Sequence, residues 1–523
     1  MRIKLILSLT GTILAFFGLS FILPILVGLY MGEQYIDIFW MFGLPMLISL
    51  SLGTFLHNYF HSEQDIRNRE AFLLVTVVWI LMVIVGALPF IATEELLLTS
   101  YEIGIAGAIF ESMSGLSTTG ATVFDLKSSN PIVNLEQYNK GYFDAPKSLL
   151  LWRSQMQWLG GMGIIVLATI IFSRLFGGGI QVLQAEMPGT GITRLKPQMA
   201  QTARLLWSLY FFMTLVEIVL LSTLANLPLY DSICTSFSTV STGGFSPQRE
   251  SIGSYNSPLA IGIVSFFMLI SGINFVILYY VFNNLIDFTH TFSDRIKSAF
   301  KIVRENEELL FYINLVLLSF SLIFINLILD RNNENSNFTN LLHSFFQTVS
   351  LLTGTGFTTS NYSLWPQMSI FVLLLAMFTG GCAGSTTGGI KMVRIMLLFK
   401  ALKRELILVI HPRAIIKLRI GDKVLNEDLF RNVGVFFFIF IILFLLGSLI
   451  TLYLEPGISV IDGISTSLSC LANIGPGIGA IGPTETYSTF GDSTLLFLSI
   501  LMMLGRLEII TVLLLFYPDT YRD

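Results

Sequence analysis

The chain has 523 residues, of which 53% are hydrophobic and only 12% are charged, and its mean hydropathy is +0.74. Soluble globular proteins carry about 25% charged residues, so this composition excludes an ordinary soluble domain and indicates a polytopic membrane protein. The formal net charge of -4 says little about partners, because the charges are distributed very unevenly along the chain.

Ten apolar runs, taken in chain order, reach the roughly 20 residues that a helix needs to cross a bilayer. An even number of crossings places both termini on one side of the membrane. The first run follows Arg2 and Lys4 and is longer than the roughly 7–15 residues of a signal-peptide core, so we expect it to be retained as a span. The runs lie near 5–30, 36–56, 71–93, 149–175, 203–228, 257–286, 308–329, 365–399, 430–454 and 491–516.

Four shorter segments, near 104–116, 231–241, 341–352 and 460–472, lie between spans and are too short to cross. Each is apolar and rich in hydroxyl side chains, and each ends in a polar patch that contains glycine. Irregular backbone is tolerated at membrane depth only where protein buries it or where it lines water. We therefore predict re-entrant helices.

The positions of Lys and Arg predict the orientation, because cytoplasmic loops carry an excess of both. With the N-terminus inside, most of the 30 basic residues fall in the cytoplasm, and the densest cluster is the loop 391–423. This loop fits ordinary positive-inside topology or the docking of a partner. The three cysteines (Cys234, Cys382 and Cys470) lie far apart in apolar or Gly-rich stretches, so neither a disulfide framework nor a metal site is expected.

The four short segments can be superposed on one glycine each, which predicts an internal repeat. The aligned glycines are Gly120, Gly243, Gly356 and Gly475, and the preceding residues are Thr119, Thr242, Thr355 and Ile474. Eight residues before each glycine stand Ser112, Thr235, Thr348 and Ser467, and six before stand Ser114, Phe237, Ser350 and Ser469. The predicted unit is a span, a short helix, a glycine-containing loop and a second span, and it occurs four times.

This pattern favours a filter for cations. A dehydrated alkali cation needs several oxygen dipoles, which backbone carbonyls supply when four strands converge on one axis. Glycine permits the backbone conformations that this requires, and each short helix would point its partially negative C-terminal end at the pore. The alternative is that Gly and Thr serve only helix packing, but four patches at similar spacing favour the filter.

The sequence resembles the TrkH/KtrB/HKT superfamily of potassium transporters, and most closely its bacterial TrkH branch. The resemblance is carried by the four patches, by "RSQMQWLGGMGIIVL" at 153–167, by "GGCAGSTTGGIKMVR" at 380–394 and by "GRLEI" at 505–509. It implies an all-α fold of four repeats around one pore, with two extra N-terminal spans. The corresponding units are 1–68, 69–178, 179–288, 289–404 and 405–523.

The resemblance also implies the functional residues. The potassium filter would consist of Thr118, Thr119, Gly120, Ser241, Thr242, Gly243, Gly354, Thr355, Gly356, Asn473, Ile474 and Gly475. Plant relatives with Ser at the first aligned position favour sodium, so Gly120 indicates potassium. The gate would be an intramembrane loop below the filter with two basic residues, and its members are Gly380, Gly381, Gly384, Ser385, Thr386, Thr387, Gly388, Gly389, Lys391 and Arg506.

Several acidic residues have open roles at this stage. Glu217 is a candidate partner for the intramembrane Arg506, since an isolated charge within a span is costly. Glu111, in the first short helix, either braces the filter or contacts the ion. Asp231 and Asp462, near the starts of the second and fourth short helices, are expected to cap them and to complement the helix dipoles.

The resemblance implies a homodimer in the bacterial inner membrane with both termini cytoplasmic. It also implies a separate nucleotide-binding regulator similar to TrkA, K⁺ as the only bound ion, and uptake driven by the membrane potential with protons or sodium as possible coupled ions. Two alternatives stay open: a sodium or weakly selective monovalent-cation transporter, and a multi-span membrane enzyme. The enzyme lacks support, because no Ser/His/Asp arrangement, His-Glu-x-x-His motif or P-loop is found.

Overall fold

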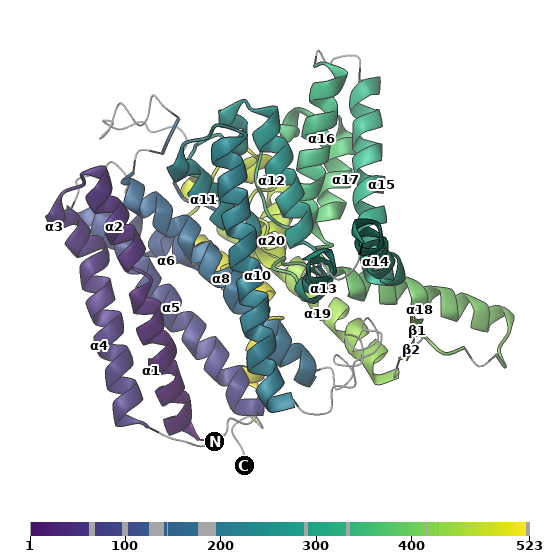
Figure 1. Ribbon diagram of the computed structural model, residues 1–523, viewed down its shortest axis with the longest axis horizontal. Coiled ribbons are helices and arrows are strands. Elements are labelled where there is room, and N and C mark those ends of the chain that lie inside the picture. Colours follow the sequence, from purple (N-terminus) through teal and green to yellow (C-terminus); the bar gives the residue numbers. More distant parts are fainter. Residues whose placement is uncertain are drawn as a thin grey trace.

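The computed structural model describes residues 2–61, 68–96, 103–124, 141–143, 145–175, 195–286, 291–330, 335–414, 416–421, 423–425 and 427–518. These residues are almost entirely helical, and the helices are arranged side by side in one assembly (Figure 1). One hairpin of two-residue strands, β1 (Arg419–Ile420) and β2 (Lys423–Val424), joins the third and fourth repeats.

The N-terminal segment is a pair of spans that packs on the first repeat. Helix α1 crosses tightly against α4 because Gly11 and Gly53 leave no space for a Cβ at the crossing, and Ser49 Oγ donates to the carbonyl of Leu14 at 2.7 Å. Trp152 of the first repeat stacks on Phe21 with ring centroids 4.4 Å apart. The helices of this segment are α1 (Ile3–Leu19), α2 (Ile22–Met31), α3 (Tyr35–Ile38), a π-helical turn (Phe39–Gly43) and α4 (Leu44–Tyr59).

In the described residues after this segment, a long helix, a short helix and one or two further helices follow one another four times, and the four predicted short helices are confirmed to within a few residues. We call these short helices the pore helices: α6 (Gly104–Leu116), α11 (Leu229–Val240), α16 (Asn337–Leu352) and α20 (Val460–Ala472). The helices before them are α5 (Asn68–Leu96), α10 (Leu195–Thr223), α15 (Glu307–Leu329) and α19 (Glu427–Leu454). The helices after them are α8 (Lys147–Leu175), α12 (Pro258–Ser271) with α13 (Phe275–Ile286), α17 (Gln367–Met377) with α18 (Met392–Ile410), and α21 (Asp492–Arg506) with α22 (Ile510–Leu513). A further helix, α14 (Phe292–Glu305), connects the second and third repeats.

Six described helices are long and apolar enough to cross a membrane, and a bent pair makes a seventh. They correspond to the first three predicted spans and to those near 203–228, 308–329 and 430–454, with the bent pair at 257–286. The other three predicted spans correspond to α8, to α17 with α18, and to α21 with α22.

The second spans of three repeats are broken, which the sequence did not predict for two of them. The run 257–286 bends by 112° between Ser271 and Phe275. The run 491–516 does not continue as one helix, because α21 ends at Arg506 and Glu508 and Ile509 adopt left-handed φ values of 60° and 46°. The third break is the predicted Gly-rich interruption between α17 and α18.

The division into units stays a prediction. Its boundaries at 178 and 288 fall outside the described residues, and its boundary at 404 falls inside α18, so the third unit extends at least to Ile410.

Asp462 forms the predicted cap, because Ser459 and Asp462 make a reciprocal capping box. Asp231 lies in the first turn of α11, where its charge complements the helix dipole, but it accepts hydrogen bonds at 2.9 Å from the hydroxyl of Tyr142 and does not form the predicted cap.

Candidate functional site

Each pore helix is followed by a strand in which left-handed and ordinary residues alternate. In the first repeat, Thr118 has a φ of 53° and Gly120 a φ of 81°, with Thr119 between them. This alternation turns successive carbonyl oxygens to the same side of the strand, as a filter requires. The equivalent pairs are Thr242 (53°) with Gly244 (81°), Gly354 (70°) with Gly356 (82°), and Asn473 (56°) with Gly475 (96°).

The four strands meet in a closed ring. The ring glycines are Gly120, Gly244, Gly356 and Gly475, and the ring carbonyls are those of the residues just before them, Thr119, Gly243, Thr355 and Ile474. A Cβ atom on Gly120 would lie closer than 3.0 Å to the carbonyl oxygen of Gly243 in the next repeat. The same close approach joins Gly244 to Thr355, Gly356 to Ile474, and Gly475 to Thr119. Glycine is therefore required at all four positions, both by its φ and by the space.

The ring corrects the predicted alignment of the second repeat by one position. The predicted ring residue was Gly243, but Gly244 carries the left-handed φ and faces the next repeat. With Gly244 aligned, the residue six positions earlier is serine in every repeat, and its carbonyl accepts from the N–H of the residue before each ring glycine at 2.7–2.9 Å. These serines are Ser114, Ser238, Ser350 and Ser469.

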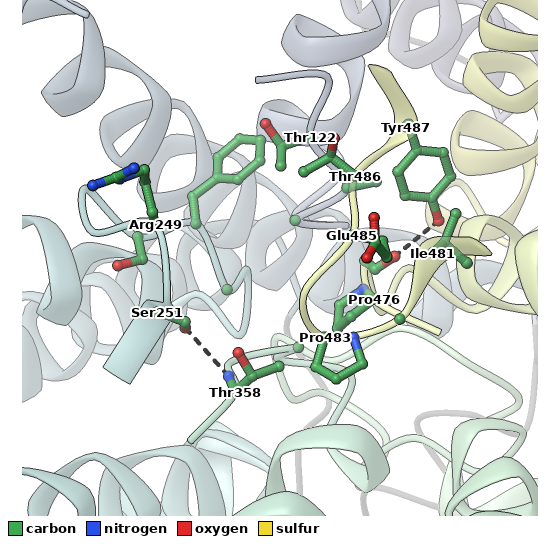
Figure 2. A pocket seen from close by; sticks show the side chains of 18 of the residues that line it. Thr122, Arg249, Ser251, Thr358, Pro476, Ile481, Pro483, Glu485, Thr486 and Tyr487 are labelled. Carbon is green, nitrogen blue, oxygen red and sulfur yellow. Dashed lines mark hydrogen bonds between the residues drawn. The ribbon is translucent and has the colours of Figure 1, made fainter. Parts of the chain in front are cut away.

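A cavity of about 70 Å³ opens directly on the ring, and all four ring glycines line it (Figure 2). Thr122 and Thr486 contribute hydroxyl groups to its wall. Two charged side chains also line it, Arg249 at the left of Figure 2 and Glu485 near its centre.

Glu111 is held beside the ring by an ion pair and hydrogen bonds, which favours the bracing role of the two left open for it. Its carboxylate is fully buried and forms an ion pair with Arg153 of α8 at 2.7 Å. It also accepts from the hydroxyl of Thr122 at 3.1 Å and from the N–H of Val123 at 3.0 Å, so it fixes the strand just beyond Gly120. Three aromatic rings (Phe124, Phe143 and Phe245) surround the Arg153 guanidinium at 4.3–5.2 Å.

Two amide side chains join different repeats at the ring. Gln157 of α8 donates from Nε2 to the ring carbonyl of Gly243 at 2.6 Å and accepts at Oε1 from the N–H of Phe245 at 3.0 Å. Asn473 of the fourth repeat donates to the hydroxyl of Thr119 at 2.9 Å. Gln157 was not predicted as a site residue, although a glutamine inside a predicted span was a signal that could have singled it out.

The interruption between α17 and α18 lies against the C-terminal ends of the pore helices α11 and α20. Thr386 donates to the carbonyls of Val240 at 3.2 Å and of Ser271 at 3.3 Å, and its hydroxyl accepts from Thr242 at 3.2 Å. A Cβ on Gly388 would clash with the carbonyl of Ala472. Positive φ values at Gly380 (78°), Gly384 (78°) and Gly389 (77°) let the loop fold into this space.

Two basic side chains donate hydrogen bonds to backbone carbonyls of this loop. Arg506, which is 2% exposed, donates from Nη1 to the carbonyl of Thr386 at 2.8 Å. Lys391 donates from Nζ to the carbonyl of Thr387 and also, at 3.2 Å, to the hydroxyl of the same residue. The predicted gate residues therefore lie together in space.

The predicted pairing of Glu217 with Arg506 is not formed. Both carboxylate oxygens of Glu217 are buried and have no hydrogen-bond partner among the described residues. Glu508, two residues after Arg506, pairs instead with Arg394 of α18 at 2.5 Å. The charge of Arg506 is thus met by a backbone carbonyl. Within the described ranges, no group of His, Cys, Asp or Glu has the geometry to hold a metal ion, and all three cysteines are buried and outside any disulfide.

Comparison with known proteins gives consistent matches over the whole chain. Residues 44–521 match the family model of TrkH, described as a cation transport protein. The chain is 34% identical to the Trk system potassium uptake protein TrkH of Salmonella typhimurium, over 100% of both chains. It is 33% identical to the Trk system potassium uptake protein TrkG of Escherichia coli K12, over 100% of this chain and 99% of that protein.

A solved structure matches equally fully. The crystal structure of the potassium transporter TrkH from Vibrio parahaemolyticus superposes with a TM-score of 0.84 at 31% sequence identity, and the match covers 100% of both chains.

Proposed function

We propose that this chain, which belongs to the TrkH family of cation transport proteins, is the translocating subunit of a potassium uptake system. The observation that carries the proposal is the ring, in which four strands of one chain present backbone carbonyls beside four glycines. A dehydrated K⁺ needs such carbonyls in place of its water. An inward potential of 100 mV supplies about 2.3 kcal/mol per monovalent ion.

The filter would consist of the predicted residues with Gly244 added. Gly120 supports the preference for potassium over sodium. According to the resemblance described above, relatives that carry serine at this position favour sodium. In this chain a serine there would need a left-handed φ of 81° and would overlap the carbonyl of Gly243. The ring thus fits glycine at its first position, which favours potassium over the sodium alternative.

The loop between α17 and α18 would be the gate. It fills the space just inside the ring, and its contacts with Val240, Ser271 and Ala472 reach the second and fourth repeats. The side chains of Arg506 and Lys391 place positive charge on the inner side of this loop, which opposes the passage of a cation as long as the loop is closed.

The proposed assembly is a homodimer in the bacterial inner membrane, with both termini in the cytoplasm and a TrkA-like nucleotide-binding subunit on the inner face. The names of the relatives, which are components of Trk systems, support the partner. Nucleotide should therefore change the flux only when that subunit is present. A nucleotide response of the purified chain alone would contradict this arrangement.

Cell growth at low potassium and ion uptake by the purified protein test the proposed function. Cells that lack their own potassium uptake should grow at low potassium when they express the chain, and proteoliposomes that contain it should take up ⁸⁶Rb⁺, with K⁺ competing better than Na⁺. Equal competition by Na⁺ would favour the sodium or weakly selective alternative. Absence of both growth and flux, with the protein present in the membrane, would refute the proposal.

A further inference from the structure

The four ring carbonyls differ in one respect. Among the described residues, only the carbonyl of Gly243 accepts a hydrogen bond, and its donor is the buried Nε2 of Gln157 at 2.6 Å. The other ring carbonyls, on Thr119, Thr355 and Ile474, have no donor in the part of the chain that the structure describes. One quarter of the ring is therefore tethered to a side chain of another repeat.

The tether occupies the place of a missing side chain. The residues equivalent to Gly243 are Thr119, Thr355 and Ile474, which all carry branched side chains. A Cβ on Gly243 would overlap Cδ of Gln157. The φ of Gly243 is not left-handed, so the backbone conformation does not explain this glycine, whereas the packing of the Gln157 amide does.

The amide is held at both ends, which makes it a rigid tether. Its Oε1 accepts from the N–H of Phe245, two residues beyond Gly243, at 3.0 Å. The two bonds span the ring glycine Gly244 and fix the strand on either side of it. One turn earlier on α8, Arg153 and its ion pair with Glu111 hold the neighbouring strand, so α8 braces two quarters of the ring.

We propose that Gln157 is a positioning residue for selectivity: it holds the ring carbonyl of Gly243 at the spacing that suits K⁺ and prevents the ring from contracting around Na⁺. This inference rests on the proposed function. Selectivity in such filters depends on cavity size and on the field strength of the carbonyls. A carbonyl that already accepts a short hydrogen bond can neither move inward freely nor offer its full negative field to a smaller ion, so both effects act against Na⁺.

The direct test is Gln157→Met, which keeps most of the side-chain volume and removes both hydrogen bonds. The matched control is Gln155→Met, two residues earlier on α8, whose Nε2 donates to the carbonyl of Ser20 at 2.7 Å, away from the ring. The readout is the ratio of ²²Na⁺ to ⁸⁶Rb⁺ uptake in proteoliposomes, which does not depend on the amount of active protein. A lost buried hydrogen bond should raise this ratio roughly three- to tenfold in Gln157→Met, and Gln155→Met should keep the wild-type ratio.

A second pair of variants tests the role even if Gln157→Met fails to fold. Gly243→Ala alone should lose flux, because its Cβ overlaps Gln157, and the double variant Gly243→Ala with Gln157→Ala should regain flux with a raised Na⁺ ratio. A folded Gln157→Met or double variant with the wild-type ratio overturns the role of Gln157. A wild-type chain that carries Na⁺ as readily as K⁺ overturns the proposed function instead.

Discussion

Replacing Gly244 by alanine tests the ring at the position where sequence alignment and structure differ. Gly244 has a φ of 81°, and a left-handed conformation costs an L-residue roughly 1–2 kcal/mol. The added Cβ would also lie closer than 3.0 Å to the carbonyl oxygen of Thr355. Relief of that overlap requires a displacement on the order of 1 Å, which exceeds the roughly 0.5 Å tolerance of a preorganised site. We expect K⁺ flux to fall by more than about tenfold, which corresponds to about 1.4 kcal/mol or more.

The assay is ⁸⁶Rb⁺ uptake into proteoliposomes, with competition by K⁺ and Na⁺ and with a thermal melt of the same sample. The control is Gly262→Ala in α12, where a Cβ would meet no atom within 4 Å. An alanine inside a helix is favourable by about 1 kcal/mol relative to glycine, so this variant should fold and transport normally. If folded Gly244→Ala transported K⁺ with wild-type rate and selectivity, the ring geometry derived above would be wrong.

Two further variants test the brace and the gate. Glu111→Gln leaves the buried Arg153 without its ion-pair partner. Removing one partner of a buried pair typically lowers the free energy of unfolding by about 3–5 kcal/mol, so the melting temperature should fall sharply. An unchanged melting temperature would show that the pair does not hold the filter. Arg506→Gln weakens the contact with the Thr386 carbonyl and removes the positive charge below the loop, so the resting ⁸⁶Rb⁺ flux should rise without a regulatory subunit. A resting flux equal to wild type would argue against Arg506 as a gate residue.

The sequence predicted the pore helices and the Gly-rich interruption well, because both depend on local composition. A short apolar helix that ends in a glycine-containing patch is visible in a single sequence, as at Gly104–Leu116 and Val460–Ala472. The choice between Gly243 and Gly244 does not follow from local composition. Both are glycines, and the backbone φ and the contact with the neighbouring repeat distinguish them. The serine six residues earlier, Ser238, was a usable but unused signal.

Contacts between residues far apart in the chain could not be predicted from the sequence. Gln157 and Gly243 are 86 positions apart, and Glu111 and Arg153 are 42 apart, so no local pattern relates them. The bend after Ser271 was not predicted, although the small and polar residues "SGIN" at 271–274 interrupt the apolar run 257–286. Its cause lies in tertiary structure: the carbonyl of Gly272 accepts from the N–H of Cys382 at 2.8 Å, in the loop of another repeat.

The four repeats share a backbone plan but not the same side chains, and this asymmetry fits a gate that acts from one side. Among the described residues, only the third repeat carries a Gly-rich interruption, and its loop leads into α18 at Met392 directly after Lys391. Glu308 ties the two together, since its Oε1 accepts from the N–H of Ala383 at 2.7 Å and of Val393 at 3.1 Å. Helix α18 extends away from the bundle (Figure 1). In the proposed function, a force on this helix would therefore reach the loop through Glu308 and, through the contacts of the loop with Val240 and Ala472, the second and fourth repeats as well.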